Sequence, residues 1–248
     1  MASALWLAAC LLAPSALAAT DPPDLSGTWG RLDVTTSVSQ VPMIGDVTTT
    51  YRAISRVQIA QTGTKLTMEE HLCVVRFESD HSEARSSLVE GFVATAPPLE
   101  RHARLVHKGG KWRLDASELI EIHGARLEHP DKDALPTDPK DPRVRDMDHD
   151  GHPGLTVNVA GLVEGSVHLV QRVRTLLRGL VRSADRIDGL ITWSRAQSVL
   201  EATNLFLRNT PSTVPHPDPS RSWFRAQRVR PGTDCATLVA DAERLFAR

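Results

Sequence analysis

Three aspartates at alternate positions form the part of this chain whose chemistry is clearest. The segment reads Asp-Met-Asp-His-Asp-Gly-His-Pro-Gly, so that Asp146, Asp148 and Asp150 can direct carboxylates into one coordination shell. A calcium loop needs this spacing, together with a sharp turn at its sixth residue and a backbone carbonyl at its seventh. Gly151 and His152 occupy those two positions. The spacing therefore predicts a Ca²⁺ site formed by Asp146, Asp148, Asp150 and His152.

The pattern Asp-x-Asp-x-Asp-Gly resembles the calcium loops of EF-hands, dockerins and thrombospondin type 3 repeats. This resemblance implies side-chain ligation by the three aspartates and backbone ligation by His152. Val157 stands where an EF-hand has a bidentate Glu, and Pro153 follows the seventh position. We therefore expect a lone loop rather than a paired sensor EF-hand. The missing ligand would come from water or from one of three other carboxylates, Asp138, Asp141 and Glu164.

Two alternatives to a calcium site remain open for this loop. Asp and Gly are ordinary residues of solvated turns, so an acidic turn without a metal has the same sequence. His149 and His152 add imidazole groups, which suit Zn, Cu or Ni. Calcium loops of extracellular modules bind weakly, with dissociation constants on the order of 10⁻⁴ to 10⁻³ M, and we expect this one to order a loop.

No catalytic residue is assigned from the sequence. The chain lacks Gly-x-Ser-x-Gly, His-Glu-x-x-His, Cys-x-x-Cys and a phosphate-binding glycine loop, which excludes several common enzyme families. Folding could assemble acid-base pairs from Glu118 and Glu121 or from His102 and His107, but their spacing does not favour this. We therefore expect a binding protein more than an enzyme.

The first 19 residues are typical of a secretory signal peptide. An apolar run from Leu5 to Ala19 ends in Ala16-Leu17-Ala18-Ala19, the small-residue pattern of a cleavage site. Residues 20–248 would then be secreted, or retained in the periplasm or cell envelope. An alternative signal, Leu7-Ala8-Ala9-Cys10, resembles a bacterial lipobox and would leave Cys10 lipidated. No later segment is long and uncharged enough to be a transmembrane helix.

Removal of the signal would leave two cysteines, Cys73 and Cys235, in an oxidising compartment. A single disulfide between them is the simplest prediction. Two free buried thiols remain the alternative, because a sequence does not report the Cα separation that a bridge requires.

Composition argues against partners with strong charge. The chain has 29 basic and 30 acidic residues, and this balance gives no electrostatic footprint for nucleic acid. Aromatic residues make up only 4% of the chain, too few for the two girdles of an outer-membrane barrel. The oligomeric state is not indicated.

Alternating apolar and polar residues predict an all-β domain. Residues 47–59 alternate, with Val47, Tyr51, Ala53, Val57 and Ile59 on one face, and a turn at 61–64 leads into a second strand over 65–77. A second hairpin is predicted at 104–115, because Gly109-Gly110 suits a type I′ turn. Further strands are expected over residues 118–125, 154–159, 166–178, 186–197 and 222–229.

Two proline-rich segments, 130–142 and 211–219, are predicted to be long loops because proline lacks the donor that a central strand needs. Residues 233–247 are predicted to form a C-terminal helix, in which Cys235 shares an apolar face with Leu238 and Leu245. About 229 residues without alternating helices favour a single all-β domain, either an antiparallel barrel or a sandwich.

The segment Leu25-Ser26-Gly27-Thr28-Trp29 resembles the Gly-x-Trp opening of lipocalins. This resemblance implies an up-and-down barrel whose base is plugged by Trp29. Our leading hypothesis is an exported, lipocalin-like barrel that binds an apolar small molecule or a lipid and uses Ca²⁺ to fix a rim loop. Two other hypotheses remain open: a cell-envelope interaction or structural module, and an extracytoplasmic hydrolase with dispersed carboxylates.

Overall fold

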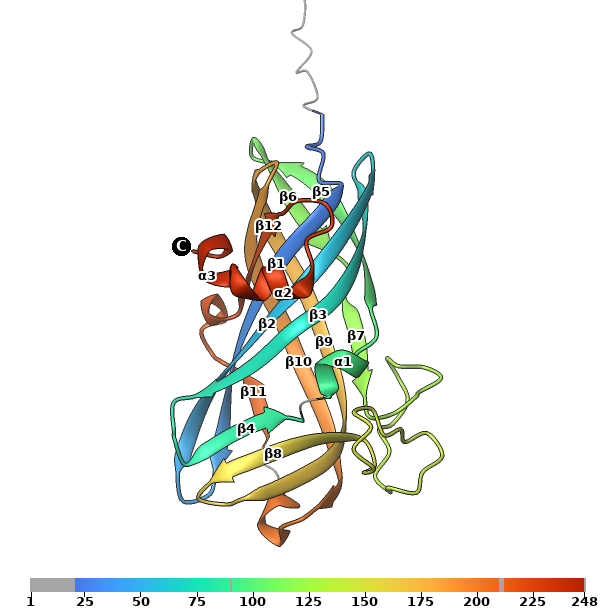
Figure 1. The fold of residues 1–248 in the computed structure, drawn as a ribbon, viewed down its shortest axis with the longest axis vertical. Coiled ribbons are helices and arrows are strands. Elements are labelled where there is room, and N and C mark those ends of the chain that lie inside the picture. The colour runs from blue at the N-terminus through green and yellow to red at the C-terminus, as the bar shows by residue number, and fades with distance from the viewer. Residues whose placement is uncertain (1–20, 90, 210–211, 248) are drawn as a thin grey trace, which may run out of the picture.

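The computed structural model describes residues 21–89, 91–209 and 212–247. Within these residues one antiparallel sheet contains 12 strands, of which 8 close into a ring. The ring follows chain order, as Figure 1 shows: β1 (Gly27–Val41), β2 (Gly45–Thr62), β3 (Lys65–Ser79), β5 (Leu99–Lys108), β6 (Lys111–Ala116), β9 (Gly165–Ser183), β10 (Arg186–Ala202) and β12 (Trp223–Arg228). β12 pairs with both β10 and β1, which closes the sheet into a barrel rather than a sandwich.

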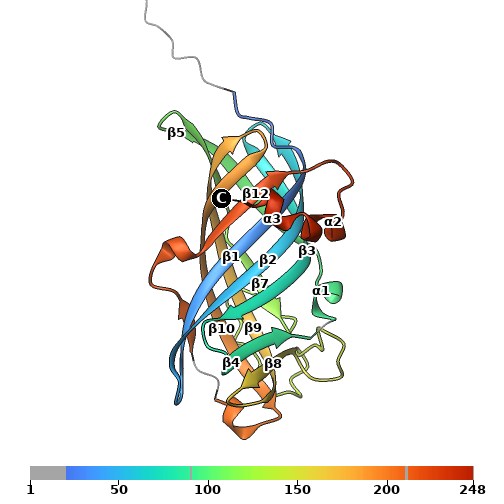
Figure 2. The ribbon, with the colours of Figure 1, turned by 60° about the vertical axis from the view of Figure 1, so that its left-hand side comes forward.

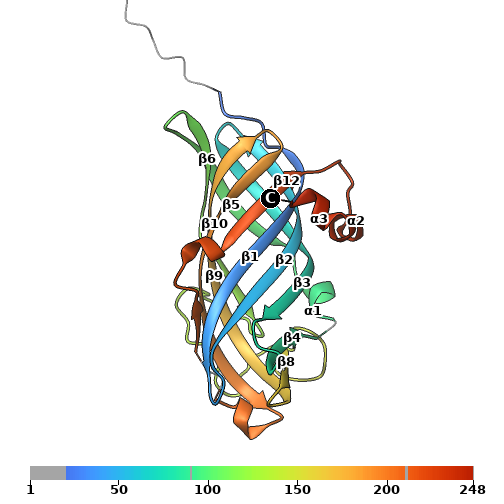
Figure 3. The same ribbon diagram turned by 90° about the vertical axis from the view of Figure 1, so that its left-hand side faces the viewer.

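Shorter strands extend the wall of the barrel. β7 (Leu119–His123) and β8 (Leu155–Gly161) pair with the edge of β9 beyond β6, and β4 (Ala84–Leu88) pairs with β8. β9 is therefore covered by β10 along one edge and by β6, β7 and β8 in turn along the other. The turned views in Figures 2 and 3 show β4 and β8 at the end of the barrel away from the β5–β6 hairpin.

The predicted hairpins are present where the alternation placed them. β2 and β3 pair throughout, and the inward positions Val47, Ala53, Val57 and Ile59 are all buried. Gly109 and Gly110 have φ angles of 61° and 70°, as the type I′ turn of the β5–β6 hairpin requires.

Two expectations about elements need correction. Segment 211–219 was expected to be entirely loop, but it contains β11 (Thr213–Pro215), which pairs with β1 outside the ring, where a proline is tolerated. Sequence alternation also did not predict β1, of which only the start at Trp29 was noted. Segment 130–142 has no strand, as predicted.

Two short helices, α2 (Cys235–Ala240) and α3 (Ala242–Leu245), replace the single helix expected over 233–247. The break is at Asp241, whose φ of −91° and ψ of 3° leave the helical region. The bend lets Phe246 join the buried Leu238 on the outside of the barrel. Gly30 makes room there, because a Cβ at this residue would lie 2.7 Å from Leu238 Cδ2.

The predicted disulfide is present, and it joins Cys73 on β3 to Cys235 at the start of α2 across a Cα separation of 5.1 Å. Three further short helices complete the described structure: α1 (Phe92–Thr95), η1 (Leu205–Leu207) and η2 (Pro219–Arg221). None of the helices in the described ranges has the length and apolar character needed to cross a membrane. The predicted signal peptide and Cys10 lie outside the described residues.

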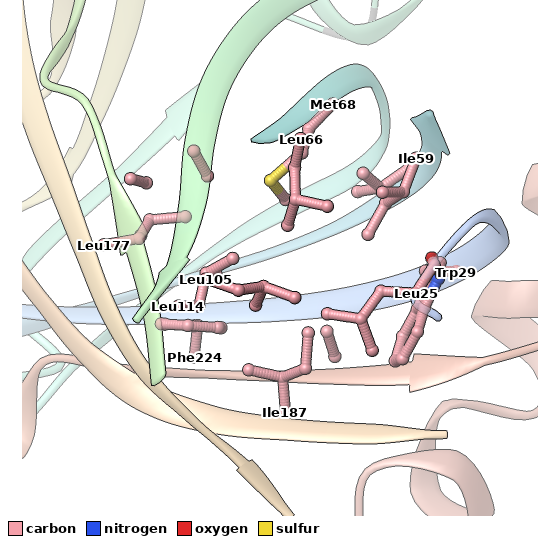
Figure 4. Close-up of a cluster of buried hydrophobic side chains, with 14 of the residues drawn as sticks. Leu25, Trp29, Ile59, Leu66, Met68, Leu105, Leu114, Leu177, Ile187 and Phe224 are labelled. Atoms are coloured by element: carbon pink, nitrogen blue, oxygen red, sulfur yellow. Dashed lines mark hydrogen bonds between the residues drawn. The ribbon is translucent and has the colours of Figure 1, made fainter. Parts of the chain in front are cut away.

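The interior of the barrel is packed at one end. Trp29 has no solvent exposure, and its indole Nε1 donates a hydrogen bond of 2.9 Å to the carbonyl of Leu25. Figure 4 shows Trp29 among the apolar side chains that close this end, and the labelled set also includes Leu25, Ile59, Leu66, Met68, Leu105, Leu114, Leu177, Ile187 and Phe224. The guanidinium of Arg228 lies 4.8 Å from the centre of the Trp29 ring.

Candidate ligand cavity and acidic loop

The three predicted aspartate ligands lie together in the structure. Carboxylate oxygens of Asp146, Asp148 and Asp150 all fall within 4.8 Å of one another. Asp148 is only 5% exposed, whereas the other two side chains reach solvent. The loop therefore brings together oxygen ligands of the kind that a hard cation prefers.

Backbone hydrogen bonds hold the loop in a tight turn. Asp146 accepts hydrogen bonds from the amides of Asp150 at 3.2 Å and Gly151 at 3.0 Å, and Asp150 accepts one from the amide of His152 at 2.9 Å. Gly151 has a φ of 86°, which explains why glycine is needed at the sixth position of the loop. His149 also lies in the left-handed region, with a φ of 57°.

One carboxylate oxygen of the cluster lacks a partner. Asp148 Oδ2 accepts a hydrogen bond of 2.8 Å from the amide of Thr156, but Asp148 Oδ1 is buried without a hydrogen-bond partner among the described residues. Burial, with the nearby carboxylates of Asp150 and Asp146, raises the pKa of Asp148. A cation at this point would satisfy Oδ1 and offset the repulsion among the three carboxylates.

The histidines of the loop do not join the carboxylates. The ring of His152 stacks on His168 with centroids 4.2 Å apart, and His168 Nδ1 lies 2.9 Å from Thr156 Oγ1. In the described ranges, the group of side chains able to hold a metal contains the three aspartates and neither His149 nor His152. Ligation by the backbone carbonyl of His152 stays a prediction of the spacing.

The other carboxylates considered as ligands lie outside this group. Asp141 is bound by Arg143, with Oδ2 2.7 Å from Nη2, and this arginine lowers the pKa of Asp141 to about 2. Asp138 accepts a hydrogen bond from the amide of Lys140 at 2.9 Å. Neither residue, nor Glu164, belongs to the group that the three aspartates form in the described part of the chain.

The acidic loop, which is the whole segment 124–154 between β7 and β8, is anchored to the outside of β9. Arg174 donates hydrogen bonds of 2.8 Å both to the carbonyl of Asp131 and to Glu118 Oε2. Gly154 ends the loop with a φ of 94°, and a Cβ there would lie 2.5 Å from the carbonyl oxygen of Leu169. This close approach places the cluster directly against the wall of the barrel.

Met147 connects the acidic loop to the interior. It stands between two of the aspartates, packs in the cluster that contains Phe92, Leu155 and Leu169, and lines the barrel cavity. The conformation of the acidic turn and the shape of the cavity wall therefore both depend on Met147.

A cavity of about 610 Å³ occupies the barrel beyond the packed end. Its lining is mainly apolar around residues such as Leu72, Val157, Val167, Leu169 and Leu207. The lining also includes Met43 on the β1–β2 turn, exposed by 86%, and Phe206 on η1, exposed by 81%. Because these lining residues are exposed, the cavity opens to solvent at this end, the lower one in Figure 1.

Buried ion pairs separate the packed end from the cavity. Arg31 Nη1 and Nη2 donate hydrogen bonds of 2.6 and 2.8 Å to the two carboxylate oxygens of Glu70. Arg31 also binds Asp33, and Arg101 Nε donates to Glu70 Oε1 at 3.0 Å. Burial alone would raise the pKa of Glu70, but Arg31 and Arg101 outweigh it and hold this pKa at about 2.

Sequence reasoning missed these cavity residues. The inward positions of β1 are Arg31, Asp33, Thr35, Ser37 and Ser39, which carry no apolar alternation. The one available signal was the alternation of Arg31 and Asp33 directly after Trp29, with the period of a strand.

The acid-base pairs considered from sequence are not assembled. Glu118 binds Arg174 on the outer surface, whereas Glu121 lines the cavity and lies 3.5 Å from His123 Nε2. His102 is exposed beside Glu100, and His107 packs against Trp112 near the tip of the β5–β6 hairpin.

Comparisons with protein-family models, curated proteins and solved structures found no match for this chain. The resemblances to calcium loops and to lipocalins therefore rest on the residues themselves.

Proposed function

We propose that this chain is an exported, lipocalin-like binding protein whose barrel takes up an apolar small molecule or a lipid. The observation that carries this proposal is the open cavity of about 610 Å³, which lies within the usual size range of small-molecule sites. The packed end, where Trp29 is buried, is consistent with the base of a lipocalin-like barrel. We further propose that Ca²⁺ binds Asp146, Asp148, Asp150 and the carbonyl of His152, and orders the loop that contributes Met147 to the cavity.

The cavity favours this function over the two other hypotheses. An interaction or structural module would be expected to have a filled interior, because it has no need for a ligand-sized space. A hydrolase would be expected to present carboxylates available for proton transfer. The buried carboxylate of Glu70 is not available in this way, because its oxygens are already bound by Arg31 and Arg101.

Binding of a neutral fluorescent probe, N-phenyl-1-naphthylamine, to residues 20–248 would test the cavity. We expect its fluorescence to rise on binding, because the dye leaves water for an apolar site. Thr49 lines the cavity, so Thr49→Trp should reduce binding by filling it, whereas Thr50→Trp on the opposite face of β2 should not. A wild-type protein that leaves the dye in water would refute the proposed function.

Thermal unfolding in EDTA and in millimolar Ca²⁺ would test the metal site. Ca²⁺ at one hundred times its dissociation constant should stabilise the folded state by about 2.7 kcal/mol. The double variant Asp146→Asn/Asp148→Asn should lose this stabilisation. Asp131→Asn/Asp138→Asn, which changes acidic residues of the same loop outside the cluster, should retain it. An equal midpoint with and without Ca²⁺ in the wild-type protein would contradict a stabilising calcium site.

A further inference from the structure

Arg195 places a cation in the cavity wall without a protein anion to match it. It lines the cavity from β10, and its Nε is buried with no hydrogen-bond partner among the described residues. The guanidinium carbon of Arg195 lies 5.9 Å from the centre of the Trp193 ring. Arginine stays charged in proteins, so its buried Nε calls for an acceptor that the described residues do not supply.

The other inward arginines show what a satisfied guanidinium looks like in this barrel. Arg31 binds both Asp33 and Glu70, and Arg101 binds Glu70 and the carbonyl and hydroxyl oxygens of Thr175. These two arginines and two carboxylates balance in charge. Arg195 takes no part in this group, so its guanidinium can pair with a molecule that enters the cavity.

Glu121, another carboxylate that lines the cavity, lies on a different strand from Arg195. Arg195 is in register with Val173 on β9, and Val173 is in register with Glu121 on β7. Two strand spacings separate Arg195 from Glu121, or about 10 Å between their backbones. Glu121 lies 3.5 Å from His123 Nε2. Tyr51 also lines the cavity and adds a hydroxyl group to its polar surface.

Beyond Gln197 and its register partner Gln171, which also line the cavity next to Arg195, the wall towards the open end is mainly apolar. Farther along β10, Val199 pairs with Leu169, and Ala202 pairs with Val167. All four of these residues pack in the apolar cluster of this half of the barrel. Seven residue steps separate Arg195 from Ala202, or about 23 Å of strand, which is room for an extended hydrocarbon chain.

We propose that the cavity selects an amphipathic anion, such as a long-chain carboxylate, whose acidic head binds Arg195 and whose chain lies along Leu155, Leu169 and Val167 towards the open end. This inference rests on the proposed function, since it names the class of ligand for the same cavity. A guanidinium matches a carboxylate in both charge and hydrogen-bond geometry.

Competition against N-phenyl-1-naphthylamine would test this proposal with two probes of equal chain length, dodecanoate and dodecanol. The wild-type mature chain should bind dodecanoate at least about tenfold more tightly, because a charge-assisted hydrogen bond in a buried site contributes this much. Arg195→Gln should remove this preference, which is a ratio of two affinities measured on the same variant. Arg195→Lys should keep part of it, and Arg52→Gln, at an exposed arginine on β2, should keep all of it.

The outcomes separate this inference from the proposed function. If the wild-type protein binds the dye but binds dodecanoate and dodecanol equally, the anionic class is wrong and the apolar cavity stands. An Arg195→Gln variant that keeps the full preference would also overturn the role of Arg195. If the wild-type protein binds none of the three, the proposed function fails as well. The comparison of the two probes on wild-type protein remains decisive even if a variant does not fold.

Discussion

At the scale of single residues, the most demanding feature is the buried group of Arg31, Asp33, Glu70 and Arg101. Removing charged groups from water is costly, and their hydrogen bonds offset that cost only while every partner is present. Glu70 is the centre of the group, because it accepts hydrogen bonds from both arginines. Removing its charge would leave two buried guanidinium groups with one carboxylate between them.

We therefore expect Glu70→Gln to lower the free energy of unfolding by about 3 to 5 kcal/mol, the usual cost of breaking a buried ion pair. Urea unfolding would measure this change. Glu78→Gln is the matched control on the same strand, because Glu78 pairs with Arg52 at 3.2 Å in solvent. It should cost less than about 1 kcal/mol. Equal effects of the two substitutions would mean that the buried group does not contribute as its geometry suggests.

The same residue predicts a dependence of stability on pH. The pKa of Glu70 is about 2 in the folded protein, against an ordinary value of 4.5. A lowered folded pKa means that the unfolded chain takes up the proton first, so this contribution is present above about pH 4.5 and is lost as pH falls towards 2. Calorimetry should show a steeper fall in midpoint for the wild-type protein than for Glu70→Gln in this range. If the midpoints of the two proteins fall equally with pH, Glu70 does not contribute to stability in this way.

At the scale of elements, the acidic loop depends on glycines that let it approach β9. Gly154 has a φ of 94°, and a Cβ added at this residue would lie 2.5 Å from the carbonyl oxygen of Leu169. The loop also packs through Met147 into the cluster that lines the cavity. A displacement of this backbone would therefore reach both the metal ligands and the cavity wall.

Gly154→Ala should destabilise the protein by more than the roughly 1 to 2 kcal/mol that a left-handed backbone costs an L-residue, because a steric clash is added. It should also weaken Ca²⁺ binding measured by titration calorimetry, since the loop must shift. Gly63→Ala is the control, because Gly63 has a φ of 59° and open space around its Cα. Undiminished Ca²⁺ affinity in Gly154→Ala would show that the site does not depend on this contact.

At the scale of the whole molecule, the aspartate cluster and the cavity lie on opposite faces of the barrel wall at β9. The three aspartates lie outside β9, the proposed ligand lies inside the barrel, and Met147 belongs to both regions. If Ca²⁺ orders this wall, the affinities for the metal and for the ligand are linked, and each must change the other by the same factor.

We expect Ca²⁺ to raise the affinity for N-phenyl-1-naphthylamine by about fivefold or more, the lower end of typical coupling between sites. Fluorescence titrations with EDTA and with Ca²⁺ would measure this factor, and calcium titrations with and without the dye should return the same one. Asp146→Asn/Asp148→Asn should remove the dependence. If the protein binds Ca²⁺ but its affinity for the dye is the same with and without the metal, the loop contributes to stability alone.

Local sequence determined much of this protein, because the features concerned depend on neighbours along the chain. Alternation placed the β2–β3 and β5–β6 hairpins, and the pair Gly109-Gly110 specified its turn. The spacing of Asp146, Asp148 and Asp150 likewise brought three carboxylates together within one turn. The pairing of Cys73 with Cys235 could be predicted from the sequence, because removal of the predicted signal peptide leaves only these two cysteines.

Only the tertiary structure decided what the inside of the barrel contains. The inward face of β1 is polar from Arg31 to Ser39, so no alternation of apolar and polar residues marked it as a strand. Its position in the sheet follows from its pairing with β12, which closes the ring. The partners of Arg31 and Arg101 come from strands far apart in sequence, as does the apolar wall beside Arg195. Ring closure sets these distances, because strand register brings together residues that no local spacing relates.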